Sequence, residues 1–270
     1  MQRNLSSSVV RLALMLCIAM STAPAGADDS AARALADRMI EAHGGLDRWN
    51  AMPTVSFRRL STRQGESAAD DVIVVVEQGR RRTYLQWPAN GARIVSDGAT
   101  VWSTGWDRPM PPSFMVHLDY YFFGLPWFTR DSGVQLAMME SGSLPGQSVV
   151  SSKVRMSFDA SNRSSDDVFI LYIEPQTNLL RGVEYTVTHA AVIGASKLPE
   201  GQRSLGPFFR IYDKHERIDG LVVPVKARSV SGEGQLRASD ELREISFRLP
   251  FDLSRMAMPE GAKLDQSRAQ

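Results

Sequence analysis

The sequence predicts a mainly β protein with few helices, in which one antiparallel sheet curls around an N-terminal helix and a central aromatic helix. Apolar residues recur at helical spacing near the start of the chain and again in one aromatic segment. From Thr54 onward, stretches of strand length alternate apolar and polar residues between turn-forming residues. No repeat of strand, long helix and strand follows Pro53, and parallel pairing would require one. The sheet should therefore be antiparallel.

Composition excludes several functional classes. The chain has 270 residues, 43% of them hydrophobic, which is enough to bury a core. Its net charge of +1 provides no basic field of the kind that holds nucleic acid, so no nucleic-acid partner is expected. The single cysteine, Cys17, cannot form an internal disulfide, and four histidines leave little material for a metal site. We expect no metal and no cofactor.

Residues 1–27 have the features of a secretory signal peptide. Arg3 and Arg11 precede an apolar run over 12–20, and the small residues Ala25-Gly26-Ala27 follow it. The run of about nine residues is shorter than the roughly 20 that a membrane span needs. We therefore expect this segment to be removed, and no transmembrane span to remain in the mature chain.

Cleavage is predicted after Ala27. Lipid attachment at Cys17 is disfavoured because Leu16 occupies the preceding position, where a small residue is preferred. The mature chain would contain no cysteine, so an oxidising compartment such as a bacterial periplasm poses it no pairing problem. Residues 28–270 should form a single domain, because no later boundary is rich enough in Pro, Gly and Ser to separate two.

A helix should begin directly after this leader. Asp28-Asp29-Ser30 supplies an N-cap, and Gly44-Gly45 accepts the left-handed backbone angles of a helix end. The spacing predicts a helix over 31–43 and a short second turn that ends at Asn50, before Pro53. Its apolar face carries Leu35, Met39, Ala42, Leu46 and Trp49.

The strands are predicted from alternation. It is clearest over 150–158, where Val150, Val154, Met156 and Phe158 should share a buried face. Two further strands with the same alternation are predicted over 183–187 and 244–249. Further strands are expected over 55–60, 72–77, 83–87, 92–96, 100–103, 134–139, 168–173, 208–212 and 221–227.

Three dipeptides mark hairpins between neighbouring strands. They are Asn90-Gly91, Asp97-Gly98 and Asp219-Gly220, which supply the positive φ that tight hairpin turns need. An antiparallel meander follows from them. The segments 159–166 and 194–206 should be long surface loops.

Residues 114–128 are the most informative stretch, because seven aromatic residues lie within it. Ser113 can cap a helix, and Gly124 and Pro126 should end one, so we predict a helix over 114–123. This helix is apolar on several sides and must be buried on several sides. The sheet is expected to curl around it, which gives the sheet a concave apolar trough.

Such a trough can bind a hydrophobic or lipidic ligand. A buried acyl chain gains about 0.8 kcal/mol per methylene, and stiff aromatic rings can line a cavity without collapsing it. The competing interpretation is that these aromatic side chains only fill the core. The predicted ligand-binding residues are Trp87, Trp102, Phe114, His117, Tyr120, Tyr121, Phe123, Trp127 and Phe128.

Several short motifs together resemble a known superfamily. They are His43-Gly44-Gly45-Leu46 with Trp49, the Ser96-Asp97-Gly98 turn before Val101-Trp102, and Asp219-Gly220-Leu221-Val222-Val223-Pro224. In this order, after an exported leader, they resemble the LolA/LolB lipoprotein-localisation superfamily. One further segment of the chain resembles a periplasmic branch of this superfamily. It is Tyr121-Phe122-Phe123-Gly124-Leu125-Pro126, followed by the Asp131-Ser132-Gly133 turn.

The resemblance implies an incomplete antiparallel β-barrel of about eleven strands, whose open hydrophobic mouth is covered by helices. It also implies a lipid chain as ligand, because members of this superfamily either carry lipoproteins to the outer membrane or sense the state of the envelope for a regulator. A lipoprotein or an envelope protein is then the expected partner. The chain differs from the carrier in its greater length and in its aromatic helix.

No hydrolase motif of the type G-x-S-x-G, S-x-x-K or H-E-x-x-H occurs, so a non-enzymatic role is expected. The alternative is an envelope hydrolase that uses His117 or the pair Asp213 and His215. Strand alternation places that pair on one face and Glu216 on the other, which argues against a metal site. The His43 side chain should interact favourably with the dipole at the C-terminal end of its own helix. A regulatory or structural envelope protein is a third possibility.

Positive charge gathers near the first hairpin, in Arg58-Arg59 and Arg80-Arg81-Arg82. It could meet anionic lipid headgroups. Basic residues are also common on solvated edge strands, where they discourage pairing with other chains. The sequence leaves both interpretations open.

Overall fold

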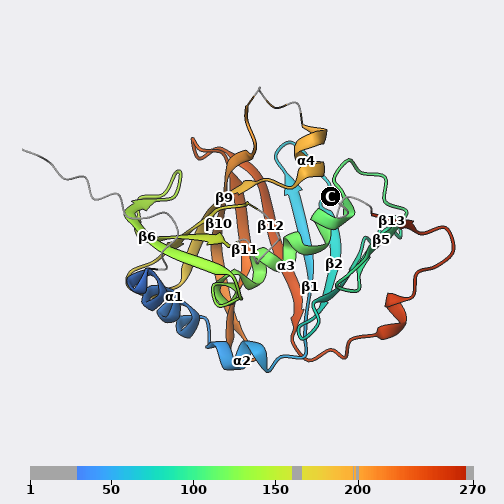
Figure 1. Cartoon of the computed structure of the whole chain (residues 1–270), viewed down its shortest axis with the longest axis horizontal. Coiled ribbons are helices and arrows are strands. Elements are labelled where there is room, and N and C mark those ends of the chain that lie inside the picture. The colour runs from blue at the N-terminus through green and yellow to red at the C-terminus, as the bar shows by residue number, and fades with distance from the viewer. Residues whose placement is uncertain (1–28, 160–165, 197, 199–200, 266–270) are drawn as a thin grey trace, which may run out of the picture.

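The computed structural model describes residues 29–159, 166–196, 198 and 201–265 (Figure 1). The predicted signal peptide and most of the predicted loop over 159–166 lie outside these residues. The helices are α1 (Ser30–Ala42), α2 (Leu46–Asn50), α3 (Pro112–Phe128), α4 (Ala190–Ala195) and a 3-10 turn at Leu253–Met256. The strands are β1 (Thr54–Arg63), β2 (Asp70–Glu77), β3 (Arg82–Gln86), β4 (Arg93–Ser96), β5 (Val101–Thr104), β6 (Val134–Ser143), β7 (Val150–Phe158), β8 (Phe169–Ile173), β9 (Leu180–Val187), β10 (Leu205–Ile218), β11 (Leu221–Val230), β12 (Leu236–Ser246) and β13 (Lys263–Leu264).

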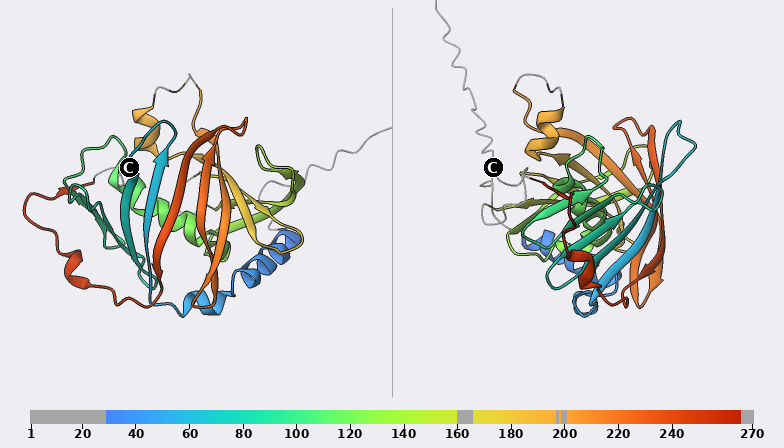
Figure 2. Two further views of the ribbon diagram at one scale, coloured as in Figure 1. Left: turned by 180° about the vertical axis from the view of Figure 1, so that it is seen from behind. Right: turned by 90° about the vertical axis from the view of Figure 1, so that its right-hand side faces the viewer.

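All these strands belong to one antiparallel sheet. Its order is β13-β5-β4-β3-β2-β1-β12-β11-β10-β9-β8-β7-β6, and its edges β13 and β6 do not pair. The sheet is therefore an open half-barrel, which Figure 2 shows from behind and from the side. This confirms the predicted incomplete barrel around an N-terminal and a central helix, although the sheet has 13 strands where about eleven were predicted.

The concave side of the sheet holds the core. Figure 1 shows α3 running across this side. One hydrophobic cluster joins α3 and α2 to β1–β5 and includes Trp49 and Phe57, and a second joins α3 and α1 to β6–β10 and includes Met39 and Leu171. Two smaller clusters cover parts of the convex side. Among the described residues, no helix is both long enough and apolar enough to cross a membrane.

Helix α1 lies against the edge strand β6. Asp29 caps it, because its carboxylate accepts from the backbone N–H groups of Ala31 and Ala32 at 2.8 and 3.2 Å. The backbone N–H of Asp29 donates to the carbonyl of Leu136 on β6 at 2.9 Å. The start of α1 thereby satisfies part of the free edge of the sheet. The helix predicted over 31–43 is confirmed within one residue.

His43 ties the end of α1 to the sheet. The ring is fully buried, its Nδ1 donates to the Val222 carbonyl at 2.6 Å, and its Nε2 accepts from the Leu180 N–H at 3.1 Å. Burial lowers the pKa of His43 to about 3, so the ring is neutral at pH 7. The prediction that the His43 side chain interacts with the end of its own helix was wrong, because its two hydrogen bonds join it to β11 and to the start of β9.

The predicted hairpin turns are confirmed. Gly91 and Gly98 have φ of 72° and 97°. In the turn between β10 and β11, both Asp219 and Gly220 have positive φ, 49° and 85°. Two residues at positive φ match the twist of the flanking strands, which is why a two-residue turn fits there.

Three elements were missed by the sequence analysis. The first part of β12 is rich in polar residues and shows little alternation, and β13 has only two residues. Helix α4 begins just before the predicted loop over 194–206, and β10 starts within that loop, at Leu205.

Two predictions of strand faces were wrong. Val150 was predicted to share the buried face of β7 with Val154, Met156 and Phe158, but it is the first residue of the strand and is 57% exposed. On β10 the register shifts on both sides of Lys214, so Asp213 and His215, which were predicted to share a face, do not.

We predict that the free energy of unfolding falls as pH drops from about 6.5 towards 3. The unfolded chain then binds a proton at His43 that the native chain excludes, which costs at most about 1.4 kcal/mol per pH unit. Urea unfolding at several pH values measures this. His43→Gln should be less stable at pH 7 and should lose less stability on acidification. Parallel pH curves for the two proteins would contradict the assignment.

Candidate functional site

Helix α3 is the centre of the candidate site. It begins at Pro112, and the N–H of Ser113 donates to the Asp265 carboxylate at 2.5 Å. The N–H of Asp265 in turn donates to the Val101 carbonyl at 2.8 Å, so the C-terminal segment fixes the start of the helix to β5. Ser113 was predicted to cap the helix from outside; it lies in the first turn.

The helix runs past the predicted end at Phe123, through Gly124 and Pro126, to Phe128. A proline has no N–H and leaves the carbonyl four residues earlier without its helical partner. That carbonyl belongs to Phe122, and it accepts from the Tyr212 hydroxyl at 2.7 Å. A tertiary hydrogen bond from β10 therefore replaces the missing helical one.

Gly124 lets two aromatic rings reach the helix backbone. A Cβ at this position would lie 2.6 Å from the Phe128 ring and 3.0 Å from the Trp49 ring. The glycine is thus required by packing within the helix and does not end it.

Most predicted ligand-binding residues lie in the packed interior around α3. Phe114, His117 and Tyr121 on α3 are half-buried. Trp102 lies on the convex side against Tyr84 and Val95, which corrects its predicted place at the trough. Those that are buried on the concave side are Trp87, Tyr120, Phe123, Trp127 and Phe128.

The side chains of α3 fill the trough. Trp127 stacks on Trp49 with ring centroids 4.2 Å apart and planes 2° from parallel, and Phe123 stacks on Phe57 at 4.8 Å. The helix therefore occupies the middle of the trough, as expected for a sheet that curls around it.

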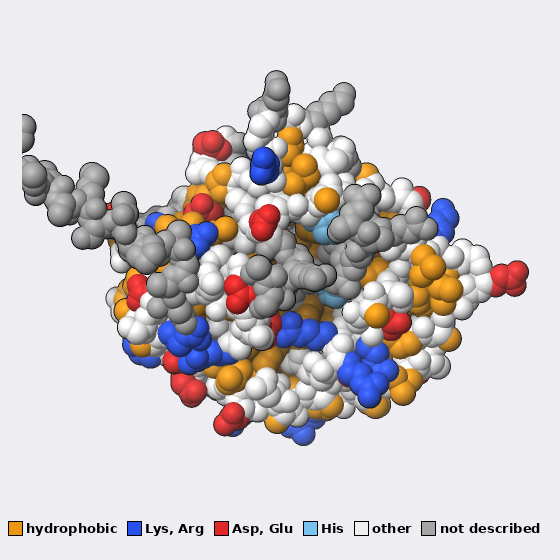
Figure 3. All heavy atoms as spheres, in the orientation of Figure 1, with side chains coloured by type: hydrophobic (Ala, Val, Ile, Leu, Met, Phe, Trp, Pro, Cys, Tyr) orange, Lys and Arg blue, Asp and Glu red, His pale blue; other side chains and the backbone are white. Residues whose placement is uncertain are grey.

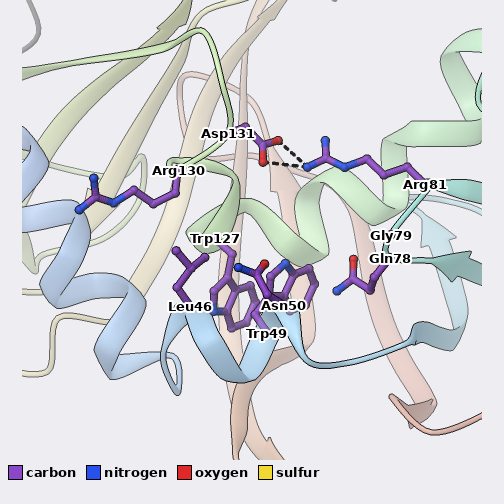
Figure 4. Close-up of a pocket in the computed structure, with 9 residues that line it drawn as sticks. All are labelled: Leu46, Trp49, Asn50, Gln78, Gly79, Arg81, Trp127, Arg130 and Asp131. Atoms are coloured by element: carbon purple, nitrogen blue, oxygen red, sulfur yellow. Dashed lines mark hydrogen bonds and ion pairs between the residues drawn. The ribbon is translucent and has the colours of Figure 1, made fainter.

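A pocket of about 250 Å³ remains at the C-terminal end of α3 (Figure 4). Figure 3 looks onto this side of the molecule, where hydrophobic side chains lie at the bottom of a hollow with basic ones beside it. Arg81 donates to both oxygens of Asp131, at 2.8 and 2.7 Å, and lies 5.0 Å from the Phe128 ring. The lining residues are Leu46, Trp49, Asn50, Gln78, Gly79, Arg81, Trp127, Arg130 and Asp131.

Polar groups at this pocket are strained or incompletely paired. Arg81 has a φ of 51°, which is unfavourable for a residue other than glycine. The Tyr120 hydroxyl donates to the Gln78 carbonyl oxygen, while the buried Gln78 Nε2 has no hydrogen-bond partner among the described residues. Burial raises the pKa of Tyr120 and of Tyr121, so both hydroxyls are neutral at pH 7.

A row of aromatic side chains lines the concave side next to α3. It comprises one residue from each of four neighbouring strands, and we call it the aromatic wall: Phe158, Phe169, Tyr185 and Phe208. Successive centroids are 6.2, 6.1 and 5.5 Å apart, and Phe208 is 39% exposed. Tyr121 packs on it, 5.1 Å from Phe169. These four residues were not predicted as ligand-binding, although alternation along each strand is the signal that places them on the concave face.

A chain of buried and half-buried charges lies under α3. The Arg59 side chain is 9% exposed and faces Asp119 of α3 at 2.9 Å, Asp70 at 3.1 Å and Asp240 at 3.9 Å. Burial alone would lower the pKa of Arg59, but the three carboxylates raise it above its ordinary value. The chain continues through Asp240 to Arg210 and through Asp70 to Arg108.

The predicted basic patch does not form a free cationic surface. Arg59 points inward, and its neighbour Arg58 points outward and pairs with Asp71 at 2.6 Å. Arg82 pairs with Glu77 at 2.6 Å. Alternation with Val55 and Phe57 was the signal that would have placed Arg59 inside.

Of the hydrolase alternative, the pair Asp213 and His215 does not come together. Asp213 is exposed and pairs with Arg228, whereas His215 turns inward and its ring lies 5.4 Å from that of His43. Burial lowers the pKa of His215 to about 4. No group of three or more potential metal ligands occurs in the described part of the chain.

No protein-family model and no curated protein matches the chain. A solved structure of a DUF1329 family protein from Desulfovibrio piger is similar at a TM-score of 0.52, with 9% identity over 84% of this chain and 97% of that one. A LolA superfamily protein from Nitrosomonas europaea has a TM-score of 0.49 at 12% identity, covering 81% and 94%. A domain described as outer membrane lipoprotein-sorting, from Vibrio parahaemolyticus, has 0.48 at 8%, covering 82% and 97%. At these identities the likeness concerns the fold alone, and the open half-barrel described above is the architecture that the sequence analysis predicted.

We predict that Gly124→Ala destabilises the protein by about 1–3 kcal/mol, although alanine favours helix by about 1 kcal/mol. The added methyl group would clash with the Phe128 and Trp49 rings. Gly194→Ala in α4 is the matched control, because nothing lies within 4 Å of its Cβ position, and it should be neutral or stabilising. Thermal or urea unfolding compares the two. Equal stability of both variants would show that the rings can move away.

Proposed function

We propose that the protein binds a hydrophobic or lipidic ligand on the concave face of the half-barrel, between α3 and the aromatic wall. The observation that carries this proposal is the wall itself: four aromatic side chains on adjacent strands, two of which contact Tyr121 and Phe122 of a single helix. Phe208 at its end is 39% exposed. An exposed apolar surface that continues into the interior is typical of a ligand-binding groove.

The apolar contacts of α3 are of a kind that a ligand can replace. Burying one large apolar side chain is worth about 1.5–3 kcal/mol, and ten methylenes of an acyl chain about 8 kcal/mol. An acyl chain on the aromatic wall would therefore compensate for the loss of a few side-chain contacts of α3. Lipoprotein acyl chains are one such ligand. We propose a binding role without catalysis.

The proposal includes export. The order of basic, apolar and small residues over 1–27 supports a cleaved signal peptide and a periplasmic location, where a lipoprotein or an envelope protein would be the partner. Amino-terminal sequencing of the protein purified from a periplasmic extract tests the predicted cut after Ala27.

We predict that gently purified protein carries lipid and that Tyr121→Asp reduces the amount retained. A carboxylate against Phe169 would make the groove unfavourable for an acyl chain. Native mass spectrometry and lipid extraction measure retention. Val150→Asp is the control, because Val150 is 57% exposed and lies away from the groove. Lipid-free wild-type protein that also fails to take up added lipid would refute the proposed function.

We predict that ligand binding changes the near-ultraviolet circular dichroism of the protein. The parallel indoles of Trp49 and Trp127 lie 4.2 Å apart, and movement of α3 would alter their coupling. Titration with a monoglyceride should diminish this signal, and Trp127→Phe should remove it beforehand. Binding that leaves the spectrum unchanged would show that the ligand lies elsewhere.

A further inference from the structure

We infer that the ligand is an anionic amphiphile whose negatively charged headgroup takes the place of Asp119 on Arg59. This inference rests on the proposed function and adds the chemical class of the ligand. It follows from the charge balance of the chain of charges under α3, from the Arg210 donor that this chain leaves unpaired, and from its position beside the aromatic wall.

The chain of charges is neutral only while α3 is seated, and its buried members are Arg59, Arg210 and Asp240. It contains three arginines and three aspartates, joined by five ion pairs of 2.5–3.9 Å: Arg59, Arg108, Arg210, Asp70, Asp119 and Asp240. Asp119 is the member that α3 contributes. Arg108 is held on the side of the sheet, with its Cζ 5.3 Å from the ring of Trp87, which follows β3.

If α3 withdraws Asp119, the remaining five groups carry one unbalanced positive charge. An uncompensated charge in an apolar interior is strongly unfavourable. A ligand with one negative charge restores the balance, whereas a neutral ligand of the same shape does not. The groove should therefore discriminate between two amphiphiles with the same chain and different headgroups.

One guanidinium donor is left for a further acceptor oxygen. The buried Nε of Arg210 has no hydrogen-bond partner among the described residues, whereas Arg59 Nε lies 2.9 Å from an oxygen of Asp119. Asp119 thus pairs with Arg59 and leaves the Arg210 donor unpaired. A carboxylate or phosphate headgroup on Arg59 that is free to orient can also accept from Arg210.

The charges lie where the head of an amphiphile would be if its chain followed the aromatic wall. Arg210 and Phe208 are two residues apart on β10 and share the concave face. The Arg210 Cζ is 5.1 Å from the ring of Phe122, which in turn packs 4.8 Å from Tyr185 of the wall. Charge and apolar surface are therefore contiguous, as an amphiphile requires.

The test compares three probes with one oleoyl chain: oleate, oleoyl lysophosphatidic acid and neutral monoolein. Delipidated protein is titrated with each below its aggregation limit, and the affinity ratio of anionic to neutral probe is measured by calorimetry. We expect wild-type protein to prefer at least one anionic probe by about tenfold or more. The better of the two anionic probes distinguishes a fatty acid from a phosphate lipid as the source.

Arg59→Gln should bring the affinity ratio close to one. Arg58→Gln is the matched control, because Arg58 is the adjacent residue on the convex face and pairs with Asp71. If Arg59→Gln does not fold, Asp119→Asn replaces it and should raise the ratio above that of wild type. Equal binding of all three probes to wild-type protein would overturn this inference and leave the proposed function standing. Binding of none would refute both.

Discussion

The concave face of an open antiparallel sheet is apolar and must be covered, and this requirement governs the molecule. The inward residues of every strand from β1 to β12 cannot be satisfied by the sheet itself, because its edges do not meet. One helix, α3, covers the middle of that face, with α1 and α2 beside it. The helix can do so only because it is apolar on several sides, so that it contacts the strands on both flanks. The aromatic side chains of one short segment thus cover the apolar face of a whole sheet.

Covering the face demands that α3 depart from local rules for helices. Pro126 is tolerated because the Tyr212 hydroxyl donates a hydrogen bond to the Phe122 carbonyl, which has no helical partner. Gly124 is accepted because rings of Phe128 and Trp49 occupy the space of its side chain. The first turn is capped by Asp265, more than a hundred residues away in the chain. Each exception is resolved by a tertiary contact.

These contacts also explain which features were predictable from sequence. Alternation placed most strands, because burial on one face imposes a period of two. It also held the signal for Arg59 and for the aromatic wall, but a run of arginines suggested a surface and masked the inward position. The end of α3 was not predictable, since Gly124 and Pro126 signal termination unless their distant partners are known. The same is true of the pairing between Arg59 and Asp119, which are distant in sequence and meet only after the sheet has curled.

Apolar and polar contacts of α3 have different roles, and the difference bears on binding. Apolar packing holds the helix against the sheet, but such packing has little directional preference and would tolerate a shift along the groove. The buried pair of Arg59 and Asp119 is directional and fixes where the helix lies. Buried ion pairs add little net stability, yet breaking one by removing a single partner is strongly unfavourable. For the binding role that we propose, α3 would be displaced only by a molecule that replaces both kinds of contact, and the buried charges would then select the ligand.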